Sequence, residues 1–504
     1  SATLDLMLGD ATYWLQQRPL SDPPMQAWFL DGFSPARNEA LWTPQLFRLM
    51  ALHSSPMTRL ATYSSAGQIR RDLLDAGFNV ERQDGFGSKR HMLVARGNKR
   101  EPSRRTSTAP WFDFSRFQAG ERQAVVIGAG LAGCFTANAL ARRGWRIELL
   151  DRAPDLASGA SGIPQLALRC RLFNSTEPQA QFYLQAYGHS VRSLSKLNDS
   201  GQRVFHDCGV RQLASAMKSR HAPESQLVAG LYPESIVKAD AQGDYLFPEG
   251  GWVDSRQLCQ SLVDHPNITF RGNSAVESIN LMGDTWHLHG EESADLGQYP
   301  VTIIANGFDA HHLIGNYKLP LQKIIGQSSQ LATSEELAIC NEVLCGDKTL
   351  LPSLNGMHTV SATYRSEDAS DCPREEDDRE NQEALAAMLG IDVNSLELQQ
   401  SWVGSRCNSR DRFPLVGPVP DFHATSLNYA DLRRNAKAII NTHATYLPGL
   451  YLNTAHGSNG LCSSPLSAEY LASLIDGGSS PIEKDLMDAL NPVRFLIQDM
   501  KKQR

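Results

Sequence analysis

The chain has 504 residues, which predicts two or three domains, and its 41% hydrophobic and 20% charged residues are typical of a soluble globular protein. No run approaches 18 uninterrupted apolar residues, and the first residues lack the basic start and apolar stretch of a signal peptide, so we expect neither a membrane span nor secretion. The net charge of −7 argues against a nucleic-acid binder that works through its overall charge.

The nine cysteines are scattered, and none has the Cys-x-x-Cys spacing. This pattern predicts neither a disulfide framework nor a structural zinc site. Cys340 and Cys345 are the closest pair, and we expect both to be small core residues in a reducing compartment. We therefore expect a cytoplasmic protein without a metal, and a monomer.

The first zone, residues 1–96, alternates strand-like and helix-like runs. The expected strands are 27–30, 60–63 and 91–95, and the expected helices are 42–52 and 69–76, the second closed by Gly77. Strands that alternate with helices predict a parallel α/β sheet.

A polar stretch rich in Pro, Ser and Thr, residues 97–122, is typical of a linker between domains. A basic cluster at its start can hold phosphates, and it consists of Arg96, Lys99, Arg100, Arg104 and Arg105. The third zone, 123–504, begins a new α/β pattern with short strands such as 268–270 and 301–304 in its middle. The acidic run 375–378 is expected to be a solvated helix start or loop.

The clearest motif begins at the apolar run 125–127. Gly128, Gly130 and Gly133 follow it, then a helical run and a second strand that ends before Asp151. Gly128 allows the tight turn, Gly130 lets the backbone approach a pyrophosphate, and Gly133 lets helix and strand pack closely. The helix N-terminus attracts phosphates, and an acid about 20 positions further on can accept both ribose hydroxyls. The order of these parts predicts a dinucleotide site.

Two features favour FAD over NAD. Ala137 keeps the helix face small, as in flavoprotein fingerprints. The stretch 158–162 resembles the pyrophosphate-contacting stretch of amino-acid oxidases, which makes Ser161 and Gly162 expected cofactor contacts. We find no second fingerprint, so a separate NADPH domain is not expected.

A second glycine-rich turn, 455–461, precedes an apolar helix expected over 465–475. Gly457, Ser458 and Gly460 are candidates to stabilise negative charge on a reduced flavin ring. A plain helix start explains the same spacing, and the sequence leaves both interpretations open.

The order of segments resembles that of the bifunctional tRNA 5-methylaminomethyl-2-thiouridine biosynthesis proteins, which fuse a methyltransferase to a flavin oxidoreductase. The shared stretches are 9–11, 28–38, 41–44 and 85–90 in the first zone, and 159–162, 248–252, 305–307, 411–417 and 490–496 in the rest. They run from one end of the chain to the other.

The resemblance implies a partial Rossmann-like methyltransferase domain over 1–96, followed after the linker by a glycine-oxidase-like FAD domain over 123–504. The FAD domain is expected to join a Rossmann-type FAD-binding part to an antiparallel-sheet substrate part. We add Val276 to its expected cofactor contacts.

In that family the flavin domain oxidises the C–N bond of a carboxymethylaminomethyl group on a wobble uridine of tRNA and leaves an aminomethyl group. The first reaction resembles glycine oxidase chemistry, which needs a cation to hold the substrate carboxylate. Arg406 stands where glycine-oxidase-like enzymes carry that arginine. Arg410 is the rival, and a surface ion pair is the plainer role for Arg406.

The methyltransferase domain of that family then methylates the amine with S-adenosylmethionine. An alkyl ammonium titrates near roughly pH 10, so the amine needs a base to free its lone pair. Asp31, at the end of an expected strand, can take up that proton, although a helix cap is its alternative role. Asp10 is expected near the adenine of the methyl donor, whereas Trp28, Trp42 and Phe33 are expected in the core rather than stacked on bases.

The chain departs from the family pattern in three ways. The glycine-rich methyl-donor loop is expected before Asp5, and the chain starts at Ser1 without Met, so we expect a start within a natural protein and poor binding of S-adenosylmethionine. Ile163 replaces an expected Asn, which weakens one flavin contact, and Asn459 replaces an expected Arg.

Two other functions stay open at this point. One is a small-molecule amino-acid oxidase of the glycine or sarcosine type with an unrelated N-terminal domain. The other is a non-catalytic tRNA-binding fragment.

Overall fold

The computed structural model describes residues 7, 9–20, 22–85, 87, 89–97, 109–199, 201, 203–214, 230–315, 317, 319–338, 340–365 and 372–502. The chain divides into two compact units, of which the first comprises Ser1–Arg116, Lys437–Ala444 and Gly477–Met487, and the second Phe117–Ala436, Thr445–Asp476 and Asp488–Arg504. The domain boundaries at 96 and 122 stay a prediction. Most of the basic cluster (Lys99, Arg100, Arg104 and Arg105) lies outside the described residues.

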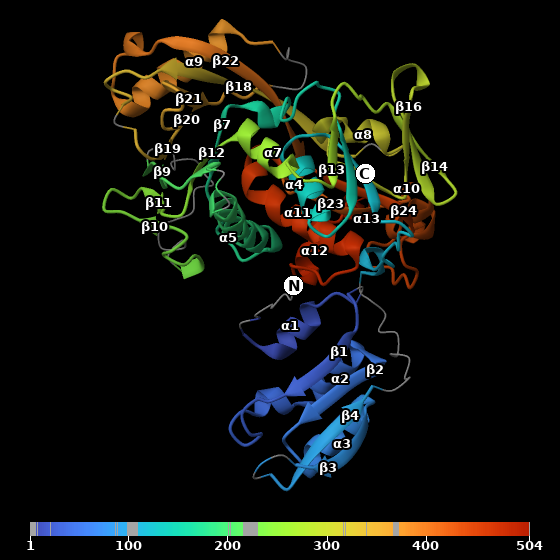
Figure 1. Ribbon diagram of the computed structural model, residues 1–504. Helices are drawn as coiled ribbons and strands as arrows, with labels where there is room; N and C mark the ends of the chain where they lie inside the picture. Colours follow the sequence, from blue (N-terminus) through green and yellow to red (C-terminus); the bar gives the residue numbers. More distant parts are fainter. Residues whose placement is uncertain are drawn as a thin grey trace. The chain divides into compact units, whose positions relative to one another are not determined.

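The first unit holds a four-stranded sheet with helices packed on it (Figure 1). Its elements are α1 (Ala11–Gln17), β1 (Met25–Leu30), α2 (Pro44–Leu52), β2 (Ser54–Thr62), α3 (Gly67–Ala76), β3 (Asn79–Asp84) and β4 (His91–Arg96). The strand order is β1-β2-β4-β3, and only β1 and β2 are parallel. The expectation of a parallel sheet was therefore wrong for the expected strand 91–95 (β4), which is antiparallel to β2. Strand β3 was not expected, and its short connection to β4 allows only an antiparallel hairpin.

The second unit is built on a six-stranded sheet in the order β13-β6-β5-β17-β24-β23. These strands are β5 (Gln123–Ile127), β6 (Arg146–Leu150), β13 (Ile268–Arg271), β17 (Val301–Ile304), β23 (Leu415–Pro420) and β24 (Tyr446–Thr454). All neighbours are parallel except β23 and β24. This is the Rossmann-type part expected from the fingerprint.

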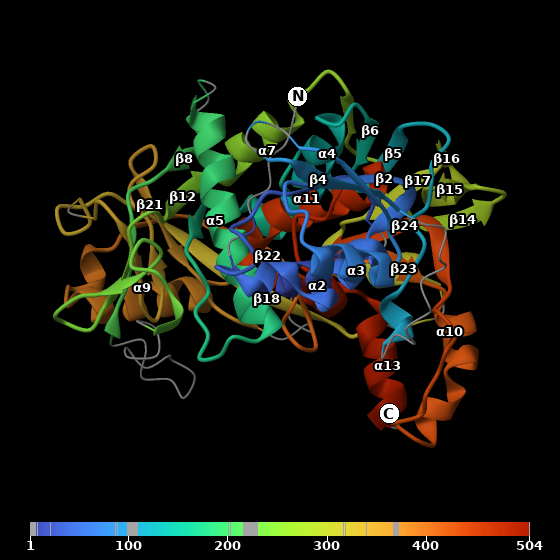
Figure 2. The ribbon, with the colours of Figure 1, turned by 90° about the horizontal axis from the view of Figure 1, so that it is seen from below.

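Three long helices pack beside one another in this unit. They are α4 (Leu131–Ala141), α5 (Pro178–Asp199) and α11 (Gly460–Asp476). Helix α11 contacts both of the others, and Figure 2 shows α5 in green beside α11 in red. The fully buried Phe182, Leu140 and Leu471 are part of the core of this unit.

A second, eight-stranded sheet forms the expected substrate part, in the order β10-β11-β9-β19-β20-β21-β18-β22. Its strands are β9 (Val210–Gln212), β10 (Lys238–Ala239), β11 (Tyr245–Phe247), β18 (Leu321–Ala332), β19 (Val343–Cys345), β20 (Thr349–Leu350), β21 (Met357–Ser361) and β22 (Leu398–Ser409). Every pair is antiparallel except β9 and β19. The long pair β18 and β22 places Arg406 opposite Ile324.

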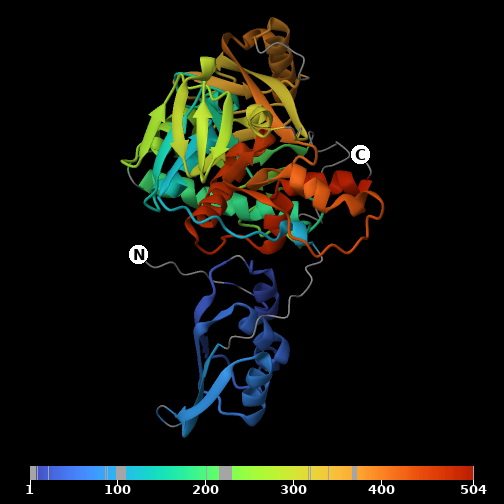
Figure 3. The same cartoon turned by 90° about the vertical axis from the view of Figure 1, so that its right-hand side faces the viewer.

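Smaller elements complete the second unit. A meander of β14 (Ser278–Met282), β15 (Thr285–His289) and β16 (Asp295–Tyr299) appears in yellow-green in Figure 3. A three-stranded sheet joins β7 (Gln165–Leu168), β12 (Gly251–Asp254) and β8 (Phe205–His206). The remaining α-helices of this unit include α7 (Ser255–Val263), α8 (Ala310–Leu313), α10 (Phe422–Asn428) and α13 (Val493–Lys502), whereas most of α12 (Lys484–Leu490) belongs to the first unit.

The acidic run 375–378 begins helix α9 (Glu375–Leu389), but two of its acids are not solvated as expected. Asp378 accepts hydrogen bonds from the hydroxyls of Ser329 (2.5 Å) and Ser401 (2.6 Å). Asp377 forms an ion pair with Arg365 at 3.0 Å. These contacts fasten α9 to β18 and β22, and burial is acceptable because each carboxylate has partners.

Within the described part of the chain, no helix has the length and apolar character needed to cross a membrane. The same residues hold no group of three or more His, Cys, Asp or Glu side chains placed to bind a metal ion. All nine cysteines are described and are free thiols, and Cys340 and Cys345 are buried as expected.

Candidate active site

The glycine turn after β5 is confined by its neighbours. Gly128 has a φ of 106°, and a Cβ there would lie 2.7 Å from the carbonyl oxygen of Ala305. A Cβ on Gly133 would lie 1.8 Å from the carbonyl oxygen of Gly128. Only glycine fits either position, because both lie against the backbone of the protein itself.

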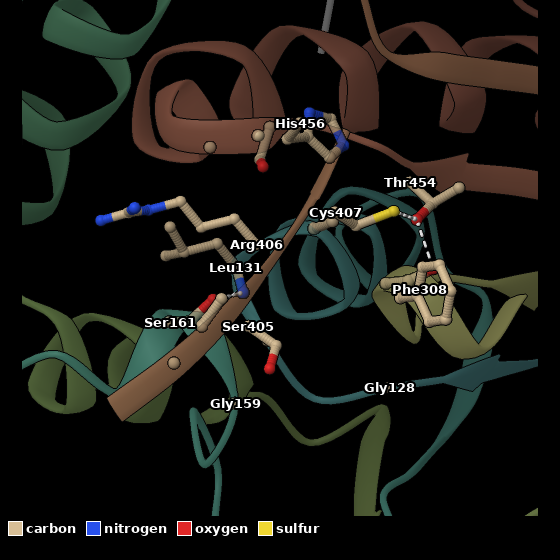
Figure 4. Close-up of a pocket in the computed structure, with 18 of the residues that line it drawn as sticks. Gly128, Leu131, Gly159, Ser161, Phe308, Ser405, Arg406, Cys407, Thr454 and His456 are labelled. Carbon is tan, nitrogen blue, oxygen red and sulfur yellow. Dashed lines mark hydrogen bonds between the residues drawn. The ribbon is translucent and has the colours of Figure 1, made fainter. Parts of the chain in front are cut away.

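The start of α4 is capped by a residue from another segment. Ser161 accepts a hydrogen bond from the Leu131 N–H at 3.0 Å, as Figure 4 shows, and a Cβ on Gly130 would lie 3.1 Å from the same hydroxyl oxygen. Asp151 Oδ2 accepts from the Ala129 N–H at 2.7 Å. Because a carboxylate can accept several hydrogen bonds, Asp151 keeps capacity for ribose hydroxyls.

One cavity of about 1110 Å³ extends from this turn to the eight-stranded sheet. Nine of the predicted site residues line it: Gly128, Gly130, Asp151, Ser161, Val276, Arg406, Gly457, Ser458 and Gly460. Its volume is slightly above the roughly 300–1,000 Å³ of most ligand sites, which leaves room for a dinucleotide. The open glycine turn, the capped helix start and the acid are chemically suited to FAD.

Two predicted cofactor contacts are not among the lining residues. Gly133 packs against Gly128, as expected for helix–strand packing. A Cβ on Gly162 would lie 2.2 Å from the Trp402 ring, so this glycine is required by the packing of the loop. Ile163, where Asn was expected, is buried and also lines the cavity.

The turn before α11 faces the same cavity. Gly457 has a φ of 58°, and a Cβ there would lie 2.2 Å from Asn408 Oδ1 of β22. Asn459, where Arg was expected, lines the cavity as well. The sequence left open whether this turn is more than a helix start, and its position beside the fingerprint favours a role at the cofactor.

Behind the turn, His456 belongs to a polar network inside the protein. Its Nδ1 lies 2.8 Å from the Ser463 hydroxyl and its Nε2 lies 2.9 Å from Asn453 Oδ1. The Asn453 amide donates in turn to the Thr136 hydroxyl at 2.9 Å. Burial lowers the pKa of His456 to about 4, so the imidazole is neutral at pH 7.

Arg406, on β22 of the eight-stranded sheet, lines the cavity. Its Nη1 is buried without a hydrogen-bond partner, and within the described residues no carboxylate pairs with it. A Cβ on Gly326 would lie 2.7 Å from that Nη1. Burial lowers the pKa of the guanidinium, because its charge is poorly hydrated there. An unpaired buried cation is prepared to receive a carboxylate.

The rival arginine is engaged elsewhere. Arg410 forms an ion pair with Asp499 at 2.7 Å, and its guanidinium carbon lies 4.9 Å from the centroid of the Phe495 ring. It does not line the cavity. Figure 4 shows the Arg406 and Cys407 side chains pointing in opposite directions from β22, as neighbouring strand residues do.

Sequence analysis missed several residues of the cavity. Tyr364 lines it and lies against Arg406, with 4.8 Å between the Arg406 Cζ and the ring centroid. Lys323 and Arg169 line it too. Pairing between β18 and β22 brings Lys323 opposite Cys407, and no local motif signals such a pairing.

In the first unit, Asp31 follows the last residue of β1, as predicted, and caps no described helix. Two hydrogen bonds hold the loop that carries it. The Tyr63 hydroxyl donates to the Gly32 carbonyl at 2.8 Å, and the Trp42 indole N–H donates to the Phe33 carbonyl at 2.9 Å. Asp31 is therefore presented on an anchored loop at the end of a strand.

Asp10 and the aromatic residues have mixed outcomes. Asp10 caps α1 and accepts a hydrogen bond from the Tyr13 N–H at 2.9 Å. Trp42 is buried and Trp28 packs against the core, as expected. Phe33 was expected in the core and is 72% exposed, because the anchored loop turns it outward.

Family models match both parts of the chain. One described as "FAD dependent oxidoreductase" matches residues 123–474, and one described as "S-adenosyl-L-methionine-dependent methyltransferase" matches residues 1–98. The second unit thus carries an FAD-dependent oxidoreductase domain, and the first carries sequence of a methyltransferase domain.

Solved structures resemble the chain in fold. A glycine oxidase from Geobacillus kaustophilus is 17% identical with a TM-score of 0.59, and covers 74% of this chain and 98% of its own. An iminodiacetate oxidase from Chelativorans sp. BNC1 is 19% identical with a TM-score of 0.56, and covers 71% of this chain and 96% of its own. The glycine-oxidase-like fold expected for the second unit is confirmed.

Curated relatives match nearly the whole chain. The tRNA 5-methylaminomethyl-2-thiouridine biosynthesis bifunctional protein MnmC of Ectopseudomonas mendocina (strain ymp) is 36% identical over 99% of this chain and 77% of its own length. The protein of that name from Chromobacterium violaceum is 36% identical over 100% of this chain and 78% of its own. The chain belongs to the family of bifunctional tRNA 5-methylaminomethyl-2-thiouridine biosynthesis proteins.

Proposed function

We propose that the second unit oxidises the carboxymethylaminomethyl group on a wobble uridine of tRNA. The bond between the amine nitrogen and the carboxymethyl carbon loses two electrons and becomes an imine. Water then hydrolyses the imine, so that the two-carbon acid leaves as an oxo acid and the uridine keeps an aminomethyl group. FAD, when bound, supplies the two-electron acceptor for this chemistry.

The cavity residues divide this work between them. The Gly128–Gly130 turn and the start of α4 would hold the pyrophosphate of FAD, and Asp151 would hold a ribose. The turn at Gly457 would stabilise negative charge on the reduced flavin. Ser161 positions the helix start by its hydrogen bond to Leu131.

Arg406 carries the proposal. A buried guanidinium nitrogen without a partner, in the cavity that holds the glycine turn, matches a substrate that ends in a carboxylate. Arg410 is paired with Asp499 and does not compete for this role. Binding the carboxylate places the oxidised carbon at a defined distance from the cofactor.

In the first unit we propose that Asp31 accepts a proton from the aminomethyl group and orients its nitrogen toward the methyl donor, S-adenosylmethionine. Asp10 stays the predicted contact of the donor's adenine. A tRNA substrate fits a cytoplasmic enzyme. We also propose a monomer, which light scattering would test.

The test uses tRNA that bears the carboxymethylaminomethyl group, incubated with and without S-adenosylmethionine and followed by nucleoside analysis. The wild-type chain should remove the carboxymethyl group. Arg406→Gln should lower kcat/KM by about 100-fold or more, because it removes one partner of a buried charge pair. Asp31→Asn should leave this step unchanged and abolish methylation.

The alternatives give different results in the same assay. Oxidation of free glycine without any action on the tRNA would identify a small-molecule oxidase. A purified protein that stays colourless and inactive after FAD is added would identify a non-catalytic fragment. Either result would overturn the proposed function.

A further inference from the structure

Tyr364 is exposed although it lies against a buried part of the site. Its side chain is 68% exposed, and it lines the cavity beside Arg406. The Arg406 Cζ lies 4.8 Å from the ring centroid. The guanidinium therefore covers one face of the ring, and the other face is the one exposed to solvent.

The backbone holds this ring in place. The Thr363 N–H donates to the Gln327 carbonyl at 3.0 Å, and the Arg365 N–H donates to the Ile325 carbonyl at 2.8 Å. Both acceptors belong to β18. Arg365 is also paired with Asp377 of α9. A rigid aromatic ring that exposes one face is the usual platform for stacking a nucleobase.

The charge of the cavity fits a nucleic acid. Five cationic side chains line it (Arg152, Arg169, Arg171, Lys323 and Arg406), against three carboxylates (Asp151, Glu277 and Asp309). Arg169 lines the cavity without a carboxylate partner in the described residues. A positive channel with an aromatic platform is the arrangement that binds single-stranded nucleic acids.

We propose that the exposed face of Tyr364 stacks a base of the anticodon loop next to the uridine that enters the cavity, an inference that rests on the proposed function. The modified uridine itself is excluded as the stacked base by distance. Four bonds, roughly 5 Å when extended, join its carboxylate to the ring. This linker is too short to join a carboxylate held by Arg406 to a uracil ring stacked on the far face of Tyr364. A neighbouring nucleotide reaches that face.

A test of this stacking compares two substrates that share the reacting group. One is an anticodon stem-loop with the carboxymethylaminomethyl uridine, and the other is the same modified nucleoside alone. Tyr364→Leu should lower kcat/KM for the stem-loop about 5- to 150-fold, the range that stacking of one base provides. It should lower kcat/KM for the nucleoside by a clearly smaller factor, through the lost contact between the ring and Arg406, and leave the flavin spectrum unchanged. Tyr364→Phe keeps the ring and should retain wild-type rates on both substrates.

Binding of an unmodified stem-loop, followed by fluorescence anisotropy, gives a readout that does not depend on the reaction. Tyr364→Leu should weaken it by a similar factor. An equal loss on stem-loop and nucleoside would show that Tyr364 only supports Arg406, and no loss on either would show that nothing stacks there. Both results overturn the inference. A wild-type chain that binds the stem-loop through Tyr364 but converts neither substrate would overturn the proposed reaction instead.

Discussion

Arg406 contacts two residues that are distant from it in sequence. A Cβ on Gly326 would come within 2.7 Å of Nη1, and the Tyr364 ring centroid lies 4.8 Å from Cζ. These neighbours restrict the side chain although no ion pair does. A cation without a partner costs stability, and here it leaves hydrogen-bonding capacity for the carboxylate of the proposed substrate.

Gly326→Ala should move the guanidinium while leaving the flavin site intact. The added Cβ would also lie 2.8 Å from the Thr363 carbonyl oxygen, so β18 cannot absorb it. We expect kcat/KM for the modified tRNA to fall roughly 10- to 100-fold. Gly120→Ala, where a Cβ meets nothing within 4 Å, is the matched control. Equal rates for both variants and the wild type would contradict the packing described for Arg406.

His456 makes the second unit sensitive to acid. Its pKa is lowered to about 4 in the folded protein by burial, against roughly 6.5 in an unfolded chain. The unfolded state therefore binds the proton first as pH falls. The stability that depends on the neutral ring is complete above pH 6.5 and is lost progressively toward pH 4.

His456→Asn should remove that dependence. Between pH 7 and pH 5 the wild type should lose about 2 kcal/mol of unfolding free energy relative to the variant. Denaturant unfolding of both proteins at the two pH values measures this difference, and all other titrating groups cancel. Parallel pH profiles for the two proteins would show that His456 is not kept neutral by burial.

At the scale of elements, helix α13 is joined to the turn after β22 by an ion pair whose arginine is buried. Arg494 donates to both carboxylate oxygens of Asp411, at 2.9 Å from Nε and 3.0 Å from Nη2. It also donates to the Phe413 carbonyl at 2.9 Å. The planar guanidinium satisfies the carboxylate and the backbone together, which an ammonium cannot do.

Arg494→Ala should destabilise the second unit by about 3 kcal/mol, because it removes a buried guanidinium and takes the cation away from the half-buried Asp411. Arg410→Ala, which removes the more exposed pair with Asp499, should cost about 1 kcal/mol or less. Thermal unfolding of the FAD-loaded proteins compares the two. Similar losses would mean that the Arg494 pair is no more buried than its neighbour.

Elements flanked by strong turn signals were predicted well. The strand at 301–304 has the predicted bounds, because three of its four residues are apolar and Pro300 and Asn306 lie close to its ends. The helix α3 ends at Gly77, whose φ is 106°, as its sequence indicates. Strands β18 and β22 were not predicted, because their polar residues become buried only through a partner distant in sequence.

In the candidate site, the residues of local motifs were predicted and those brought together by strand pairing were not. The fingerprint residues come from one local segment, so spacing alone was enough for Gly128, Gly130 and Asp151. Arg406 needed the family resemblance, since a lone arginine on a strand carries no signal. Tyr364 depends on how β18 pairs, and Phe33 was placed wrongly because its outward turn depends on the Trp42 and Tyr63 hydrogen bonds.

For the whole molecule, the family matches at 1–98 and 123–474 assign methylation and oxidation to different parts of the chain. Given tRNA that already bears the aminomethyl group, together with S-adenosylmethionine, Arg406→Gln should therefore form the methylated nucleoside at the wild-type rate. Nucleoside analysis measures this rate. Slower methylation by Arg406→Gln would refute the separation.

Strand β22 carries Arg406 and also contacts the turn at Gly457. Arg406 and Asn408 are two residues apart on β22, and Asn408 forms a β-bridge with His456 and closes on Gly457. The guanidinium proposed to hold the substrate and the turn proposed to lie at the cofactor are therefore linked through the same strand. A shift of β22 would displace both groups together, so the distance between the substrate carbon and the electron acceptor would change little.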